Sequence, residues 1–322
     1  MGNPSSLTDL IVGPQAPTHG LLGLQRLTPD RARELRAQIE RERAAPFALE
    51  CGFPSIQDVT RGLRRLCVLG AAPATGKSTL CAIWTAEALR NGHHVVYLCV
   101  EEAASSVFDR IERAAGGPKA IDELLSAAGL YLLDSPDAYG LDLPETEPAS
   151  LAGQVRQLVS ESGSVYFFAD SLNAAESLIP LPDERGRLLT VMTRLRAVAD
   201  IPGVAGGVVV SFLNRKSIQE ARPSMEGLFG AQAIAHTADR VLIAQKAYIR
   251  DLHSGAGTEY RCADLQASVP LTAHAVRLFL AKNRFGLSSV FSTAWLDGKS
   301  CRLFPDSIQD SSVVWGELPA SK

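Results

Sequence analysis

Residues 66–79 read LCVLGAAPATGKST, in which the apolar run Leu66–Leu69 leads into a loop of small residues that ends in Gly76-Lys77-Ser78. Small residues let successive backbone N–H groups approach a triphosphate, so this pattern predicts a phosphate-binding loop. Lys77 would place its charge on the β- and γ-phosphates, and Ser78 would offer a hydroxyl to Mg²⁺. ATP and Mg²⁺ are therefore the expected cofactors. The expected nucleotide-binding residues are Ala72, Pro73, Ala74, Thr75, Gly76, Lys77, Ser78 and Thr79.

One position departs from the strict phosphate-loop pattern, because Ala71 stands where the pattern has glycine and Gly70 precedes it. A chance Gly-Lys-Ser after an apolar run is the alternative. The residues downstream argue against chance, since Leu80, Ile83 and Trp84 have the spacing of an amphipathic helix.

The composition narrows the class of protein. The chain has 322 residues, 46% of them hydrophobic, and a net charge of −3, which allows a large core in one large domain or two small ones. The acidic balance excludes a protein that binds nucleic acid over its whole surface, but it allows a local basic strip. Six cysteines without metal-ligand spacing are typical of buried side chains in a reducing cytoplasm. No segment has the length of a membrane helix, so we expect a cytoplasmic protein.

The region before the phosphate loop divides into two parts. The first is rich in Gly, Pro and Ser, which predicts a flexible arm. In the second, Thr28 as helix cap and Pro29 in the first turn predict a linker helix. Its thin apolar stripe, Leu35 and Ile39, suits docking on another subunit or on its own domain. The expected organisation is an arm over residues 1–27, a linker helix over 28–46, an ATPase domain over 47–305 and a tail over 306–322.

Unbroken apolar runs separated by helical segments indicate the fold class. The runs Val95–Val100 and Gly207–Phe212, and the apolar residues before Asp170, are typical of strands buried on both faces of a parallel sheet. Residues 134–147 and 171–186 are expected to be loops. The sequence therefore predicts an α/β fold, with a largely parallel central sheet flanked by helices and with antiparallel strands near the C-terminus.

Acidic residues follow two of these strands, with Glu101 after one and Asp170 after the other. The carboxyl ends of parallel strands meet at one edge of a sheet, so Lys77, Glu101 and Asp170 should converge. Asp170 is placed to hold Mg²⁺ together with Ser78. Glu101 is placed to orient the attacking water or accept its proton. The neighbouring Glu102 is an alternative to Glu101 in that role.

The order of these motifs resembles the RecA-fold ATPases of the DnaB-type replicative helicases and the RadA/Sms-type recombination helicases. The phosphate loop carries the resemblance together with YLCVEE at 97–102, ADS at 169–171 and SFLNR at 211–215. Residues 282–286 read KNRFG, which is similar to the signature of the RadA/Sms branch. The likeness covers about residues 50–300 and implies a RecA-like P-loop ATPase.

The resemblance also implies an assembly. Proteins of these families form rings, usually of six subunits, with ATP at each subunit boundary. Lys282 and Arg284 would then be catalytic residues that reach the γ-phosphate bound by the neighbouring copy, and the linker helix would pack on the adjacent subunit. Two cations that lie two residues apart on a strand point the same way, so they can act on one phosphate. Replication or recombination proteins are the expected further partners.

The chain also departs from both families. From these residues we expect neither the zinc-binding cysteine cluster nor the protease-like domain of the RadA/Sms proteins, and no N-terminal helical domain of the DnaB-type proteins. Phe212 stands where the helicases carry a glutamine that senses the γ-phosphate. Phe229 stands where DnaB-type proteins place an arginine on single-stranded DNA, and it could stack on a base or simply pack.

The resemblance implies DNA contacts from two loops that face the ring centre, residues 171–187 and 213–230. In the second loop the cations exceed the acidic residues by only one per subunit, although sixfold repetition around a pore would concentrate the charge. The candidate DNA-binding residues are Arg185, Arg187, Arg215, Lys216, Arg222 and Phe229.

Three functions are compatible with this sequence. The first is an ATP-hydrolysing ring motor on single-stranded DNA, a helicase or translocase of DNA replication or recombination, which KNRFG and the basic loop residues favour. The second is a nucleotide-switched assembly similar to KaiC-type proteins, which the acidic balance, Phe212 and Phe229 favour. The third is an accessory ATPase or loader that joins the ring of another helicase.

Overall fold

The apolar run that begins at Leu66 forms β1 (Arg65–Ala71), a central strand of the sheet. Parallel strands lie on both sides of it, β5 (Val204–Phe212) and β6 (Arg240–Arg250). The structure is a computed structural model. It describes residues 28–30, 32–33, 36–37, 49–214, 217, 223–250, 257–259, 270, 272–305 and 313–315, with the backbone alone at 248–250, 257–259 and 313–315.

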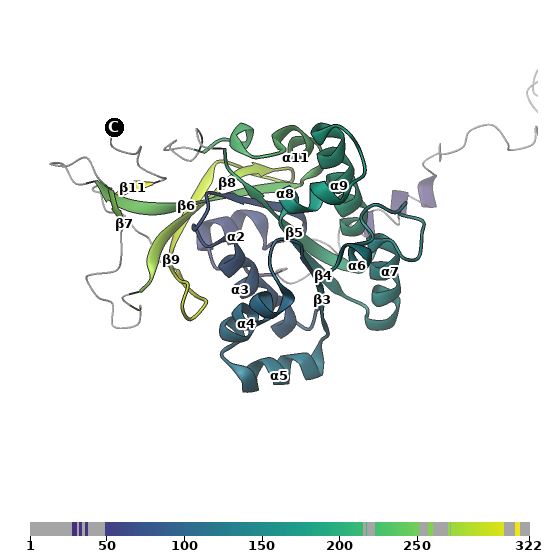
Figure 1. Ribbon diagram of the computed structural model, residues 1–322, viewed down its shortest axis with the longest axis horizontal. Coiled ribbons are helices and arrows are strands. Elements are labelled where there is room, and N and C mark those ends of the chain that lie inside the picture. Colours follow the sequence, from purple (N-terminus) through teal and green to yellow (C-terminus); the bar gives the residue numbers. More distant parts are fainter. Residues whose placement is uncertain are drawn as a thin grey trace, which may run out of the picture. The chain divides into compact units, whose positions relative to one another are not determined.

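The central sheet follows the order β10-β9-β8-β6-β1-β5-β4-β2-β3 (Figure 1). The strands from β6 to β3 run parallel, and β8, β9 and β10 join antiparallel beyond β6. Short strands β7 and β11 pair with the far end of β6. The predicted α/β fold with a largely parallel sheet and antiparallel C-terminal strands is confirmed. The remaining strands are β2 (His94–Cys99), β3 (Leu130–Leu133), β4 (Val165–Asp170), β7 (Gly257–Glu259), β8 (His274–Asn283), β9 (Val290–Asp297), β10 (Arg302–Pro305) and β11 (Val313–Trp315).

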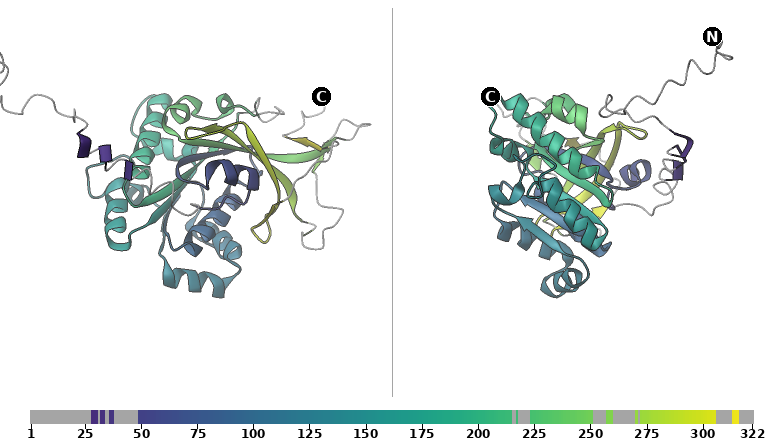
Figure 2. Two further views of the ribbon diagram at one scale, coloured as in Figure 1. Left: turned by 180° about the vertical axis from the view of Figure 1, so that it is seen from behind. Right: turned by 90° about the vertical axis from the view of Figure 1, so that its right-hand side faces the viewer.

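Helices cover both faces of the sheet, and Figure 2 shows the two layers from behind and from the side. Successive side chains of a strand point to opposite faces, so each buried strand feeds two cores. In β1, Cys67 and Leu69 join the core under α2 to α5, whereas Leu66 and Val68 join the core under α6 to α9 and α11. The helices are α2 (Pro54–Thr60), α3 (Lys77–Arg90), α4 (Ala104–Ala115), α5 (Pro118–Ala127), α6 (Pro136–Tyr139), α7 (Leu151–Ser162), α8 (Leu172–Ala175), α9 (Glu184–Ala199) and α11 (Ala231–Thr237), with 3₁₀ turns η1 (Glu176–Leu178) and η2 (Met225–Gly227).

Two stretches expected to be loops contain short helices, so those expectations are wrong in part. The stretch 134–147 includes α6, because Tyr139 is buried there and donates a hydrogen bond from its hydroxyl to the Cys99 carbonyl, 2.9 Å away. The stretch 171–186 begins with α8, where Leu172 and Ala175 are buried in the core. Buried apolar side chains hold both segments against the sheet.

The chain divides into two compact units, Met1–Pro46 and Phe47–Lys322. In the first unit, residues 29–30, 32–33 and 36–37 are helical, and the Ala32 N–H donates to the Thr28 carbonyl at 2.9 Å. The rest of the expected arm and linker helix lies outside the described residues. Strand β11 lies within the segment expected to be a tail. Among the helices that the structure describes, none is both long enough and apolar enough to cross a membrane.

Candidate active site

The phosphate loop connects β1 to α3 and has the backbone that anion binding needs. Ala74 and Gly76 both have positive φ values, 59° and 101°, and such alternation turns neighbouring N–H groups toward one centre. Glycine suits position 76, because a φ of 101° is strained for other residues and a Cβ there would also lie 2.4 Å from Cδ2 of Leu296. Gly70 serves packing instead, since a Cβ there would lie 2.0 Å from Cδ2 of Leu228. The early glycine therefore belongs to the strand, and Ala71 is tolerated at the strand end.

Lys77 is held inside this loop, with 7% of its surface exposed. Its ammonium group donates to the carbonyls of Ala72, at 2.9 Å, and Ala71, at 3.4 Å. The ammonium also lies 4.3 Å from the ring centre of Phe212. Burial lowers the pKa of Lys77, while the charges of Asp170 and Glu101 oppose that shift.

Ser78 and Asp170 meet as the sequence predicts, although they are 92 residues apart in the chain. The Ser78 hydroxyl donates to Oδ2 of Asp170 at 2.8 Å, and the Tyr97 hydroxyl reaches the same oxygen at 3.5 Å. Burial raises the pKa of Asp170 above its usual value, and the Ser78 hydrogen bond opposes that rise. A hydroxyl beside a carboxylate is a donor set that suits Mg²⁺, which normally completes its shell with phosphate oxygens and water. Among the described residues no cluster of three or more His, Cys, Asp or Glu side chains could hold a metal by itself.

Glu101 lies next to Asp170, and Glu102 points elsewhere. The backbone N–H groups of Val100 and Glu101 both donate to the Asp170 carbonyl at 3.1 Å. The Glu101 carboxylate accepts a hydrogen bond of 2.8 Å from Ser171, the residue after Asp170. Glu102 instead forms an ion pair with Arg110. This geometry favours Glu101 over Glu102 as the carboxylate near a bound phosphate.

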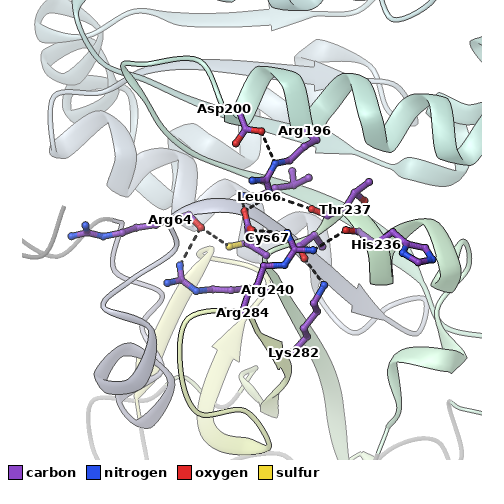
Figure 3. A network of polar contacts seen from close by, with 12 residues as sticks. Arg64, Leu66, Cys67, Arg196, Asp200, His236, Thr237, Arg240, Lys282 and Arg284 are labelled. Carbon is purple, nitrogen blue, oxygen red and sulfur yellow. Dashed lines mark hydrogen bonds and ion pairs between the residues drawn. The ribbon is translucent and has the colours of Figure 1, made fainter. Parts of the chain in front are cut away.

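Lys282 and Arg284 lie at the opposite end of β1 from the phosphate loop, and Figure 3 shows their surroundings. The Arg284 N–H donates to the Asp239 carbonyl, and the Asp239 N–H donates to Leu66, both at 2.9 Å. From Leu66 to Ala71 the strand advances about 16 Å at the usual rise per residue. Neither cation can therefore reach the phosphate loop of its own chain.

In the single chain, these two cations bind the C-terminal end of α11 (Figure 3). Lys282 donates to the carbonyls of Ala235 and Ala238, at 2.7 and 2.6 Å, and Arg284 donates to the carbonyl of His236 at 2.7 Å. Cations at this position stabilise the negative end of the helix dipole. Burial and the charge of Arg284 lower the pKa of Lys282.

Asp239 is the buried acid of this cluster, and the sequence motifs assign it no catalytic or binding role. It is 1% exposed, and its carboxylate pairs with Arg196 at 2.7 Å and with Arg284 at 3.4 Å. Arg196 also pairs with Asp200 at 2.7 Å. These contacts join strands and helices that are distant in the sequence, so local patterns do not predict them.

The candidate DNA-binding residues fall into different surroundings. Arg187 is bound within its own chain, to Glu176 at 2.5 Å and to the carbonyl of Leu181 at 3.1 Å, and the Glu176 hydrogen bond raises its pKa. Arg185 is exposed in the first turn of α9. Phe229 is partly buried against the core, which supports a packing role. Arg215, Lys216 and Arg222 lie outside the described residues.

Two hollows in the described part of the chain lie away from the phosphate loop. A hollow of about 310 Å³ lies between α3, α4 and β10, and another of about 250 Å³ lies between β3 and α7. Neither of these two contains a residue of the phosphate loop. The site is identified by its chemistry, because a lysine, a hydroxyl and two carboxylates meet at the carboxyl ends of β1, β2 and β4.

Removing the buried charge of Asp170 should stabilise the empty protein. We expect Asp170→Asn to raise the melting temperature in the absence of nucleotide and Mg²⁺ by about 2–4 °C, the shift that roughly 1 kcal/mol produces in a domain of this size class. The Asn amide oxygen can still accept the Ser78 hydrogen bond. Differential scanning fluorimetry in EDTA measures the shift, with the exposed Asp122→Asn as control. A lower melting temperature would contradict this account of Asp170.

The comparisons with known proteins agree with the fold. The sequence matches no protein-family model and no curated protein. Among solved structures, it is similar to a DnaB-like replicative helicase described together with its interactions with primase, with a TM-score of 0.61 and 14% identity over 87% of this chain and 67% of that chain. It is also similar to a second solved structure, described as an ATPase domain, with a TM-score of 0.61 and 14% identity over 88% of this chain and all of that one. The RecA-like ATPase fold inferred from the motifs is confirmed.

Proposed function

We propose that this chain is an ATP-hydrolysing subunit of a ring-shaped motor that acts on single-stranded DNA. The observation that carries the proposal is the meeting of Lys77 and Ser78 with Asp170 and Glu101 at one edge of the sheet. The two solved structures compared above are a DnaB-like helicase and an ATPase domain with a similar fold, which supports the proposal.

In the proposed reaction, different residues of the site bind the triphosphate, hold Mg²⁺ and activate the attacking water. The loop from Ala72 to Thr79 binds the triphosphate through its N–H groups, and Lys77 moves from its carbonyl partners to the phosphates. Ser78 and Asp170 would hold Mg²⁺, which neutralises phosphate charge when bound. Glu101, released from Ser171, orients the attacking water and accepts its proton.

The proposed ring places Lys282 and Arg284 on the nucleotide of the next copy. Their position at the far end of β1 suits a role between subunits, because they cannot serve their own site. The turn that follows them exposes two large apolar side chains, Phe285 at 55% and Leu287 at 72%. Exposed apolar side chains beside cations are common in contact surfaces between proteins. The binding of both cations to α11 is then their resting state.

The DNA part of the proposal has a direct test. We expect single-stranded oligonucleotide to stimulate ATP hydrolysis at low salt, and the stimulation to fall as salt rises, because phosphate contacts release counterions. Turnover is measured with and without oligonucleotide over a salt series. We expect Arg185→Ala to weaken stimulation more than Arg302→Ala, a control at an exposed arginine on β10. Absence of DNA binding at low salt, both with and without ATP, would contradict the DNA role.

A second candidate function is a nucleotide-switched assembly that moves no nucleic acid. Two observations favour it: Phe229 packs partly against the core, and Arg187 is bound to Glu176. The same titration separates the candidates, because a switch of this kind would hydrolyse ATP at a rate that DNA does not change. A third candidate is an accessory ATPase that joins the ring of another protein. Such a protein would form few complexes with its own copies, and the masses of mixed complexes would show that it had joined the other ring.

A further inference from the structure

Phe212 lies directly against the phosphate loop. It is the last residue of β5 and is in register with Ala71, the last residue of β1. The centre of its ring is 4.3 Å from the Lys77 ammonium. Lys77 is nearly buried, and its described neighbours include this ring and the two carbonyls of Ala71 and Ala72. Burial lowers its pKa, and the charges of Asp170 and Glu101 also act on it, in the raising direction.

We propose that Phe212 is a positioning residue whose ring holds the Lys77 ammonium on the carbonyls of Ala71 and Ala72 while the site is empty, so that Phe212 opposes nucleotide binding. The proposal rests on the proposed function in one respect only, that this loop binds a nucleotide. An aromatic ring attracts a cation through its quadrupole, and the attraction is strongest where water is excluded. A bound phosphate would therefore compete with the carbonyls and the ring for the Lys77 ammonium.

The backbone around Phe212 is fixed on several sides. Its N–H donates to Oδ1 of Asn173 at 3.3 Å, and its carbonyl accepts from the Phe229 N–H at 2.8 Å. The next residue, Leu213, donates to the Ala71 carbonyl at 3.2 Å. Lysine, in contrast, has a long and flexible side chain. We therefore expect Lys77, rather than the backbone that carries the Phe212 ring, to move when phosphate binds.

The chemistry of the Phe212 side chain determines whether it strengthens or weakens nucleotide binding. A phenyl ring has no donor or acceptor for a hydrogen bond to the γ-phosphate, so Phe212 stabilises the empty arrangement and adds nothing comparable to the bound one. Removal of the ring should therefore tighten nucleotide binding. A residue that only packs the site into shape would have the opposite effect, because its loss would disorder the loop and weaken binding.

The contact itself is tested without nucleotide by a double-mutant cycle on unfolding. We expect Phe212→Leu and Lys77→Met to be coupled, so that the unfolding equilibrium constants of the single and double variants deviate from independence by about 2- to 30-fold, as a partly desolvated cation–π contact produces. The matched control pairs Phe212→Leu with Lys119→Met, at an exposed lysine of α5, and should show no coupling. Additive behaviour in both cycles would overturn the proposal.

Titration with ADP tests whether the Phe212 ring weakens nucleotide binding, as we propose. We expect Phe212→Leu and Phe212→Met to bind ADP about 2- to 30-fold more tightly than the unmodified protein, and Phe212→Tyr, which keeps the ring, to match it. The methionine variant serves if the leucine variant fails to fold. Weaker or unchanged binding in ringless variants that fold would overturn the proposal. If the unmodified protein binds no nucleotide, the proposed function fails, and the cycle still decides whether the ring holds Lys77.

Discussion

Replacement of Lys77 by alanine is expected to reduce nucleotide binding at least about 100-fold. The physical reason is that the ammonium is the positive charge closest to the loop, and charge-assisted hydrogen bonds to phosphate are each worth about 1.5–3 kcal/mol. Loss of two such bonds corresponds to two or more powers of ten in affinity. Equilibrium titration with a fluorescent ATP analogue measures the change.

The control for this variant is Lys119→Ala, because Lys119 is an exposed lysine on α5. It should bind nucleotide like the unmodified protein. Lys77→Ala should remain folded, since a smaller neutral residue replaces a buried charge whose pKa burial lowers. Nucleotide binding that survives in folded Lys77→Ala would show that residues 72–79 are not the phosphate loop.

Replacement of Arg284 by alanine is expected to leave nucleotide binding intact and to reduce turnover by about 10³-fold or more. A cation that acts on the transferred phosphoryl group from a neighbouring subunit contributes this much to turnover in other phosphate-loop enzymes. The affinity should not change greatly, because Lys77 and the loop N–H groups of the subunit that binds the nucleotide remain in place. Binding titration and steady-state turnover, measured on the same preparation, separate the two effects.

Arg284 also binds Asp239 and the carbonyl of His236, so its loss could act through the fold. The melting temperature of Arg284→Ala is therefore measured beside that of Arg302→Ala, a control at an exposed arginine on β10. Arg196 still pairs with Asp239 in the variant, which should limit the loss of stability. Normal turnover in Arg284→Ala would show that Arg284 has no role in ATP hydrolysis.

The buried part of the fold could be predicted from the sequence, because its strands are apolar on both faces. Strand β4 has all six residues buried, and its predicted position is confirmed. Strand β10 was not predicted, since it is a four-residue edge strand with exposed ends and a terminal proline. Helix α6 was missed because four residues in a region rich in proline carry no helical period.

The candidate site could be predicted as far as local sequence determines it. A strand followed by small residues and Gly-Lys-Ser places Lys77 and Ser78, and an acid after a buried strand places Asp170. The position of the Phe212 ring against Lys77 depends instead on the register between β5 and β1, which the sequence does not state. The binding of Lys282 and Arg284 to α11 likewise depends on how β8 pairs with β6.

The most direct test of the central claim, that one subunit binds the nucleotide through Lys77 and the next completes the site through Arg284, is to mix the two inactive variants. Lys77→Ala and Arg284→Ala are combined at several ratios, and ATP turnover is measured after the subunits have exchanged. The account predicts that activity returns and is greatest at intermediate ratios, because some boundaries then join an intact loop to an intact arginine. Mixtures that exchange subunits but stay inactive at every ratio would contradict it.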